Sequence, residues 1–599
     1  MGDRDSTRED QLIEGIQAST RQEPRFKATE EPAPPKVVTR RQALALAACI
    51  STQASQPALG LELGALAQLL EDQFDRTPAK TAFDYGVASG DPLEDAVIIW
   101  TCVSGQPQRD SIEIGWEFAS DPEFRQIVAS GRAIAQAQSA YTVHIDVTNL
   151  NSSRWYWYRF NIPSDQQSGI KLHPASDRAG KDLFVSRVGK TRTAPSKGAI
   201  EPLRLGLGSC QHWEWGYFGA WDMLRQMKPD LVFFAGDYIY ESAAPMAVRR
   251  HRGGVPLTLD EFRQRYKQYR LDPSLQAMHA DAPWVIIWDD HELINDYAGV
   301  HAPKGESDFL PRRLYAYQAW AEFMPIRQPK ALQVARRIIW GKVADILLLD
   351  TRQHKDLQAC AEPGGARRIA LSKDCGDRYK TKRSMLGKAQ ELWAQRQFRQ
   401  MAEQSSQWPV IAQTTLMSPA LDGHGKATRY WSDGWDGYPF ARSRLLSDAV
   451  LAGLGHLLVI GGDVHTALAS DLPNSVVLDY IDPSFSAEQI RIIQRKLSEH
   501  PNIASEWTVG GISRRGWDEA RVAGRILDNP HLRWGDGRPG SFALLHLSMD
   551  KAQIEFFALE DTRTKGSSHI SLSRWQLDAG KPTMQRIYRP SELLDGAQQ

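Results

Sequence analysis

The sequence reads LVFFAGDYIY from Leu231 to Tyr240. Its first half is a continuous apolar run, which is typical of a strand buried on both faces of a sheet between helices. Its second half places Asp237 and Tyr240 three positions apart, so a loop or a first helical turn can direct both side chains at one point. Ligands of layered α/β folds gather where strands end. The stretch therefore predicts a buried strand with a binding site at its carboxyl end.

Four further segments repeat the pattern of an apolar run that ends in chemically active side chains. In chain order they are Gly208-Ser209-Cys210, Trp288-Asp289-Asp290-His291-Glu292, Leu349-Asp350-Thr351-Arg352 and Gly461-Gly462-Asp463-Val464-His465. Each segment alone is weak evidence for a site. All five in this order predict a phosphoesterase with two metal ions, because ions about 3.5–4 Å apart can clamp a phosphate ester and activate a water molecule.

One set of candidate ligands combines a thiol, carboxylates, a phenol and an imidazole. Cys210 as a thiolate is a strong transition-metal ligand, although taken alone it is more typical of a buried free cysteine. Asp237 can bridge two ions through its two oxygens, and Tyr240 can bind a hard trivalent ion because the metal lowers the phenol pKa. Asp463 and His465 come directly after a glycine pair. They are two positions apart from each other, so both can face one site from a loop. Ordinary turn or core positions are the alternative.

The other candidates are crowded charges. Asp289, Asp290, His291 and Glu292 place four ionisable groups directly after an apolar run. Such crowding is costly without a counter-charge, which a cation provides; the alternative is the acidic first turn of a helix. Arg352 can fork onto phosphate oxygens, with a surface salt bridge as its alternative role.

The chain divides by pattern into two regions after its leader. Residues 76–195 predict an all-β sandwich of immunoglobulin or fibronectin type, because apolar and polar residues alternate, as in 143–147, and turn residues separate the strands. Residues 203–599 predict an α/β domain with a central sheet. Its predicted strands are Leu231–Ala235, Trp284–Trp288, Asp345–Leu349, Pro409–Ala412 and His456–Ile460, and Ala389–Met401 is a predicted helix.

The composition is that of an ordinary globular protein. Hydrophobic residues make up 42% and charged residues 24% of 599 residues, a length that predicts more than one domain. The 72 Lys and Arg residues balance 72 Asp and Glu residues, which gives no support for general nucleic-acid or anionic-membrane binding. No apolar run reaches the length of about 18 residues expected of a membrane span.

The leader, residues 1–75, begins with a polar stretch that predicts disorder. The pair Arg40-Arg41 then precedes a short apolar stretch that ends at Ile50, which resembles a twin-arginine export signal. A disordered tail with a chance arginine pair is the alternative. We therefore expect a periplasmic or secreted protein handled by the twin-arginine machinery, with a cytoplasmic location as the alternative.

Two cysteines flank a loop without periodic pattern. In an exported protein, Cys360 and Cys375 are the preferred disulfide pair. Cys102 ends an apolar run and is more typical of a small buried hydrophobic residue.

The five segments, together with Phe83–Pro92 and Asp436-Gly437-Tyr438, resemble the PhoD-like alkaline phosphatase family of calcineurin-like metallophosphoesterases. The resemblance covers nearly all of residues 83–590. It implies a β-sandwich followed by a metallophosphoesterase sandwich domain. It also implies twin-arginine export and hydrolysis of phosphate monoesters and diesters at alkaline pH, with Fe³⁺ and one or two Ca²⁺ ions.

The resemblance also implies roles for individual residues. Fe³⁺ would be held by Cys210, Asp237, Tyr240 and His465, and Asp237 would bridge to Ca²⁺, which Asp290 and Asp463 complete. His291 and Arg352 would face the phosphate. A metal-activated hydroxide would attack phosphorus, with His291 near the leaving oxygen as the acid. Asn295 is a further candidate for the metal or its surroundings.

Two alternative interpretations remain. One is a catalytically degenerate binding protein of the cell envelope, whose sign would be lost ligands; all of them are present. The other is an enzyme of the same fold with another phosphate ester as substrate, in the manner of a phospholipase D-like enzyme or a nucleotide phosphodiesterase. Loops 241–280 and 355–385 are expected to set that choice. We expect a monomer that binds nucleic acid at most as substrate.

Overall fold

The computed structural model describes residues 81–107, 109–172, 183–303, 306–328, 332–361, 365–366, 370–372, 375–423, 428–499 and 501–588. All of them belong to one compact unit, Glu71–Gln599. The predicted leader with Arg40-Arg41 and residues 76–80 lie outside the described residues. In the part of the chain that is described, no helix is long and apolar enough to cross a membrane.

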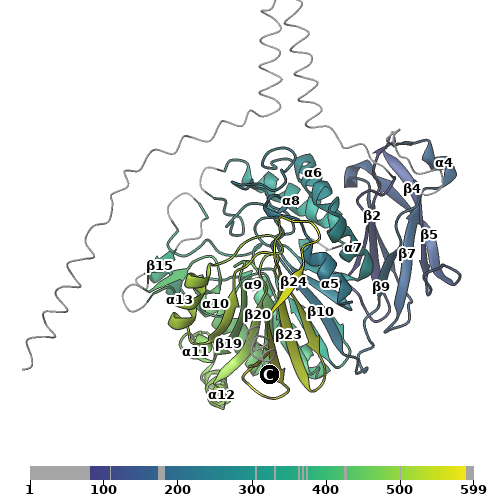
Figure 1. Cartoon of the computed structure of the whole chain (residues 1–599). Helices are drawn as coiled ribbons and strands as arrows, with labels where there is room; N and C mark the ends of the chain where they lie inside the picture. Colours follow the sequence, from purple (N-terminus) through teal and green to yellow (C-terminus); the bar gives the residue numbers. More distant parts are fainter. Residues whose placement is uncertain are drawn as a thin grey trace, which may run out of the picture. The chain divides into compact units, whose positions relative to one another are not determined.

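One mixed sheet of ten described strands runs through the molecule (Figure 1) in the order β25-β24-β23-β22-β10-β11-β12-β1-β2-β6. Its centre is a parallel set of four strands, β10, β11, β12 and β1. The strands are β1 (Val87–Gly90), β2 (Val97–Cys102), β6 (Thr142–Val147), β10 (Leu203–Gly208), β11 (Leu231–Ala235), β12 (Trp284–Ile287), β22 (Phe542–Leu547), β23 (Lys551–Leu559), β24 (His569–Asp578) and β25 (Gln585–Tyr588).

A second sheet has seven described strands in the order β13-β14-β16-β18-β20-β19-β21, of which β14, β16, β18 and β20 run parallel. The strands are β13 (Arg336–Trp340), β14 (Ala344–Leu348), β16 (Trp408–Ala412), β18 (Leu457–Gly461), β19 (Ala467–Pro473), β20 (Asn502–Thr508) and β21 (Leu532–Asp536). The predicted apolar runs match β11, β12, β14, β16 and β18, and every residue of these five strands is buried. Mixed sheets with helices are thus confirmed for the predicted α/β region.

Helices cover the sheets, and the sheets share a core. The largest core cluster joins Ile286 of β12 to Ile346 of β14 and Ile460 of β18. On the ten-stranded sheet, Trp221 of α5 packs on Trp284, with ring centroids 4.9 Å apart. A second cluster packs helices on the seven-stranded sheet, and the predicted helix 389–401 lies within α9. The described α-helices are α4 (Ser164–Gln167), α5 (Ala220–Gln226), α6 (Leu259–Arg270), α7 (Pro273–Asp281), α8 (Phe309–Phe323), α9 (Gly387–Gln404), α10 (Pro439–Leu451), α11 (Ser475–Leu478), α12 (Ala487–Ser498) and α13 (Glu519–Asp528).

The region 81–195 contributes to two sheets. Strands β4 (Ser111–Ala119), β5 (Ile127–Gln136), β7 (Trp155–Asn161) and β9 (Gly189–Arg192) form an antiparallel sheet, which packs on β1, β2 and β6 through a third core cluster. However, β1 pairs in parallel with β12, Gly90 opposite Trp284, so one layer continues the ten-stranded sheet. The division into an all-β domain at 76–195 and a second domain at 203–599 therefore stays a prediction.

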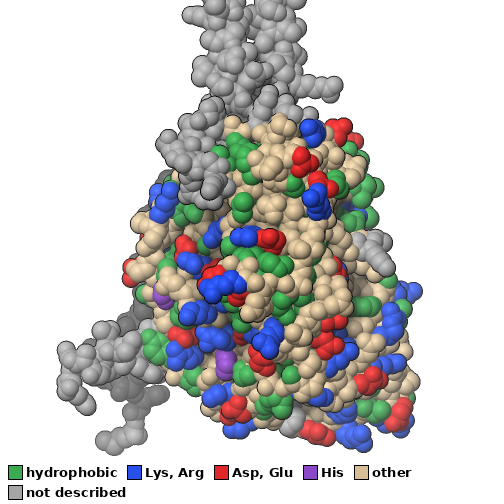
Figure 2. Space-filling model, turned by 90° about the vertical axis from the view of Figure 1, so that its right-hand side faces the viewer, with side chains coloured by type: hydrophobic (Ala, Val, Ile, Leu, Met, Phe, Trp, Pro, Cys, Tyr) green, Lys and Arg blue, Asp and Glu red, His purple; other side chains and the backbone are tan. Residues whose placement is uncertain are grey.

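Three cysteines outside the strand-end segments, Cys102, Cys360 and Cys375, are described and lie as expected. Cys360 and Cys375 form a disulfide with Cα atoms 6.2 Å apart, which confirms the predicted pair. Cys102 is buried, and its thiol donates to Ala140 O at 3.4 Å. On the face that Figure 2 presents, basic and acidic side chains are interspersed, in line with the zero net charge.

Candidate metal centre

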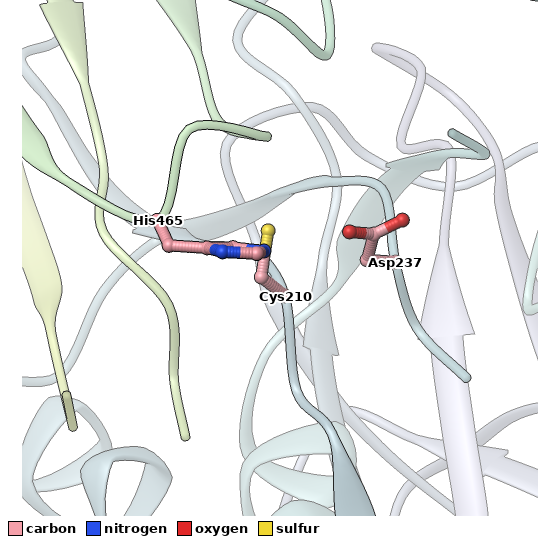
Figure 3. A group of neighbouring side chains, drawn as sticks. All are labelled: Cys210, Asp237 and His465. Atoms are coloured by element: carbon pink, nitrogen blue, oxygen red, sulfur yellow. The ribbon is translucent and has the colours of Figure 1, made fainter. Parts of the chain in front are cut away.

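Three loops at strand ends bring a thiol, a carboxylate and an imidazole together (Figure 3). Cys210 follows β10, Asp237 follows β11 and His465 follows β18, and one potential ligand atom from each lies within 4.8 Å of the others. Asp237 also forms a second such group with Asp290 and His291, both of which follow β12. Asp237 is therefore shared by two groups, as a bridging ligand must be.

Tyr240 joins the first group through hydrogen bonds. Its buried hydroxyl donates to Asp237 Oδ2 at 2.9 Å and lies 3.3 Å from His465 Nε2. Asp463 lies alongside: its Oδ2 accepts a hydrogen bond from Thr415 Oγ1 at 2.6 Å, and its charge acts on the thiol of Cys210. The structure thus gathers the predicted iron ligands and places Asp463 next to them.

The backbone at these positions is strained. Cys210, Asp237, Asp463 and His465 have φ angles of 55°, 60°, 64° and 55°, in the left-handed region. This conformation is uncommon for residues other than glycine and costs on the order of 1–3 kcal/mol each. The carboxylate of Glu292 stabilises one of the turns by accepting from the backbone N–H of Asp237 at 3.1 Å. Strain of this kind gathers at functional sites, because the surrounding fold must hold it in place.

Without a cation, the clustered donors favour their neutral forms. Burial raises the pKa of the Cys210 thiol well above its usual value, and Asp237 adds to this effect. Burial also raises the pKa of Asp237 well above its usual range; His291 opposes this rise and the neighbouring carboxylates add to it. For Tyr240, burial and Asp237 again raise the pKa. A metal ion reverses this preference, so thiolate, phenolate, imidazole and carboxylates fit a bound cation.

His291 is held by a residue that the sequence did not single out. Its Nδ1 lies 2.7 Å from Oε2 of buried Glu241, and its backbone N–H donates to Asp237 Oδ1 at 3.3 Å. Burial lowers the pKa of His291, but Glu241, Asp237 and Asp290 together raise it well above its usual range. Glu241 also accepts from the backbone N–H of Asn295 at 3.1 Å. Its position directly after Tyr240 was the only sequence signal for it.

Arg352 lies among carboxylates. Its Nε donates to Asp289 Oδ1 at 2.6 Å and its Nη1 to Asp433 Oδ2 at 2.6 Å, while Nη2 lies 3.5 Å from Asp290 Oδ2. Lys355 Nζ donates to the other oxygen of Asp433 at 2.6 Å. The side chain of Arg352 is 1% exposed, so its ion pairs are internal rather than on the surface. The fork predicted for phosphate is thus taken by acidic side chains, a geometry that favours a positioning role.

A loop after β20 reaches the centre and was also missed. Arg514 lies with its guanidinium carbon 5.7 Å from the ring centroid of Tyr240. Gly516 approaches His465 so closely that a Cβ would lie 2.3 Å from the carbonyl oxygen of His465. Beside His465 opens a cavity of about 250 Å³, which this loop also lines. The pair Gly510-Gly511 was the only sign of this loop in the sequence.

Two family models match the chain. The model described as PhoD-like phosphatase matches residues 205–556, and the model of the PhoD-like phosphatase N-terminal domain matches residues 68–195. The chain belongs to the PhoD-like phosphatase family. The resemblance inferred from the five segments is thereby confirmed.

Individual relatives agree with this assignment of the PhoD-like phosphatase. Alkaline phosphatase D of Bacillus subtilis (strain 168) is 34% identical over 474 residues, which cover 76% of this chain and 73% of that protein. A solved structure titled "Structure of PhoD" matches with a TM-score of 0.73 and 29% identity, over 86% of this chain and 93% of that chain. The predicted phosphoric-ester hydrolase is therefore confirmed, and a metal-dependent phosphatase accords with the candidate ligand groups.

Proposed function

We propose that this PhoD-like phosphatase hydrolyses phosphate monoesters and diesters at alkaline pH, with Fe³⁺ and Ca²⁺ held on the two sides of Asp237. The observation that carries the proposal is the shared carboxylate: Asp237 has donor atoms within 4.8 Å of Cys210 and His465 and of Asp290 and His291. The complete set of donors counts against a catalytically degenerate binding protein.

The donor chemistry supports the choice of metals. Cys210, Tyr240 and His465 would hold Fe³⁺ together with Asp237, because thiolate, phenolate and imidazole suit a transition ion. Asp290 and Asp463 would complete Ca²⁺, which prefers carboxylate oxygens. When bound, such ions withdraw charge from the phosphate oxygens and make a water molecule a better nucleophile.

The side chains around the metals would divide the remaining work. Attack by water on phosphorus breaks the bond to the leaving oxygen, which needs a proton to depart as an alcohol. His291 is suited to supply it, because Glu241 at 2.7 Å orients the ring and favours its protonated form. Arg352 would act through its carboxylate partners, by holding Asp289 and Asp433 in place.

The disulfide supports the proposal of export. A bond between Cys360 and Cys375 is typical of proteins outside the reducing cytoplasm. We propose that Arg40-Arg41 directs twin-arginine export. Fractionation of cells that produce the Arg40→Lys, Arg41→Lys variant tests this: the variant should be retained in the cytoplasm, and unchanged export would contradict the proposal.

Metal analysis combined with an assay tests the enzymatic proposal. The purified full chain should contain iron and calcium and turn over a chromogenic phosphomonoester and a chromogenic diester. A chelator should abolish turnover of both esters, and added calcium should restore it. A protein with neither metal and no turnover of either ester would contradict the proposal.

A further inference from the structure

The cavity beside His465 has a lining of two chemical kinds. Asp463, Val464 and His465 line it from the candidate metal centre. Two arginines and two tryptophans also line it, and we call these the cationic wall: Trp431, Arg515, Trp517 and Arg521. A group that leaves from a phosphate bound at the metal centre can extend into this space.

Two of the three acidic residues that line the cavity are paired with buried cations, and the third, Asp463, belongs to the candidate metal centre. Asp433 is paired with Arg352 and Lys355, and Asp436 Oδ1 accepts from Arg442 Nη1 at 3.0 Å. These pairs bind the carboxylates of Asp433 and Asp436 to buried cations, so neither of the two is paired with the cationic wall.

The two arginines of the cationic wall carry that charge. Arg515 and Arg521 are both exposed, and within the described parts of the chain neither forms a salt bridge with a carboxylate. Guanidinium groups fork onto carboxylate and phosphate oxygens with two parallel hydrogen bonds. An anionic group is therefore the ligand that the cationic wall favours.

The cationic wall is also held in register with the metal centre. The guanidinium carbon of Arg521 lies 5.6 Å from the ring centroids of both Trp431 and Trp517, within the range of cation–π attraction. The backbone N–H of Trp517 donates to Thr466 Oγ1 at 2.9 Å, which ties the loop to the residue after His465. The fold thus fixes the loop that carries Trp517 next to the candidate metal centre.

We propose that this cavity is the leaving-group subsite and that Arg515 and Arg521 select phosphate esters whose leaving group bears its own anionic group. The inference rests on the proposed function of the metal centre. A volume of about 250 Å³ lies below the usual range of pockets for drug-sized ligands, so the cavity fits a small organic acid. The substrate class is therefore a small phosphate ester whose alcohol carries a carboxylate or a second phosphate group.

A matched pair of substrates tests the proposal. Glycerol 3-phosphate and 3-phosphoglycerate differ in the leaving group, which is neutral in the first and carries a carboxylate in the second. The metal-loaded full chain should show a kcat/KM roughly tenfold higher for 3-phosphoglycerate, the effect of one hydrogen-bonded charge. The double variant Arg515→Gln, Arg521→Gln should lose this preference, because KM should rise more for 3-phosphoglycerate than for glycerol 3-phosphate.

The control is Arg495→Gln, which removes an exposed arginine from α12 outside the cavity and should leave the preference intact. Equal kcat/KM values for the two esters in the wild-type protein would overturn the proposal. Equal losses for both esters in the double variant would also overturn it, because the arginines would then serve the metal centre.

Failure of the proposed function would look different. If the wild-type protein turned over neither ester, calorimetry on the same preparation would still measure the binding of both. Tighter binding of 3-phosphoglycerate, lost in the double variant, would support the subsite without catalysis. Equal binding of both esters would overturn the subsite as well.

Discussion

Asp237 connects the two groups of potential ligands, and its surroundings explain why an acidic residue stands there. Its two oxygens accept hydrogen bonds, one from the hydroxyl of Tyr240 at 2.9 Å and one from the backbone N–H of His291 at 3.3 Å. Neither bond compensates a buried negative charge, and burial raises the pKa of this carboxyl well above its usual range. A carboxylate at this position is therefore favourable only beside a cation.

Replacement of the Asp237 carboxylate should remove the ligand that the two metal ions are proposed to share. We expect Asp237→Ala to lower kcat/KM by at least about a thousandfold, which corresponds to ~4 kcal/mol in the activation barrier. Metal analysis should show less bound iron and calcium. Asp561→Ala, at an exposed loop position, is the control and should behave as the wild-type protein does. Wild-type turnover in Asp237→Ala would refute the assignment of the bridge.

Arg352 has one of two roles: it contacts the substrate phosphate, or it positions the neighbouring carboxylates. A variant can distinguish them. Arg352→Gln leaves Asp289 without its buried cationic partner and leaves Asp433 with Lys355 alone, so we expect a loss of about 3–5 kcal/mol in the free energy of unfolding. The calcium concentration for half-maximal activity should also rise. Arg352 holds Asp289 in place, and the next residue, Asp290, is a proposed calcium ligand. Denaturant titration and calcium titration measure these two effects.

A matched variant makes this test specific. Arg337 pairs with buried Asp345 on the seven-stranded sheet, away from the metal centre, with its Nε 2.6 Å from Asp345 Oδ1. Arg337→Gln should reduce stability without changing the calcium requirement. If Arg352→Gln instead keeps wild-type stability and raises only KM, the side chain contacts the substrate phosphate.

At the scale of elements, the apolar runs were sufficient to predict strands. β11, β12, β14, β16 and β18 lie within one or two residues of the predicted runs, because strands buried on both faces need continuous apolar sequence. The convergence of their loops follows from parallel pairing, which brings carboxyl ends to one edge of a sheet. The family resemblance then assigned ligands to these ends.

Long-range partners could not be predicted from local pattern. Asp433 lies 81 residues from Arg352 along the chain, and Glu241 lies 50 residues from His291. Nothing in the spacing of either pair indicates contact. For the same reason the pairing of β1 with β12 could not be predicted from the sequence. It depends on two backbones that approach closely at Gly90, not on a periodic pattern.

That close approach makes a prediction about β1. A Cβ at Gly90 would lie 2.1 Å from Pro325 O and 2.5 Å from Trp284 O, both backbone atoms that cannot move aside independently. Gly90→Ala should therefore cost about 1–3 kcal/mol in the free energy of unfolding, measured by chemical denaturation. Gly198→Ala, where a Cβ meets nothing within 4 Å, is the control and should leave stability unchanged. Equal stability of both variants would contradict the tight seam between β1 and β12.

At the scale of the whole molecule, the candidate centre opposes folding unless it binds metal. Four strained backbones and several buried acidic groups meet at one edge of the sheets. The extensive shared core of both sheets supports this arrangement. A ligand that binds only the folded state adds RT ln(1 + [L]/Kd) to stability, about 2.7 kcal/mol at a hundredfold excess over Kd.

Metal removal should therefore lower the melting temperature of the PhoD-like phosphatase as well as its activity. We expect a calcium chelator to reduce Tm by several degrees, measured by calorimetry at constant pH, and readdition of calcium to restore it. Asp237→Ala should start near the lower Tm and respond little to the chelator, because its site no longer binds the ion. Asp561→Ala should respond as the wild-type protein does. A chelator shift of the same size in Asp237→Ala would place the stabilising ion elsewhere in the molecule, and no shift in the wild-type protein would show that the folded state does not depend on calcium at this centre.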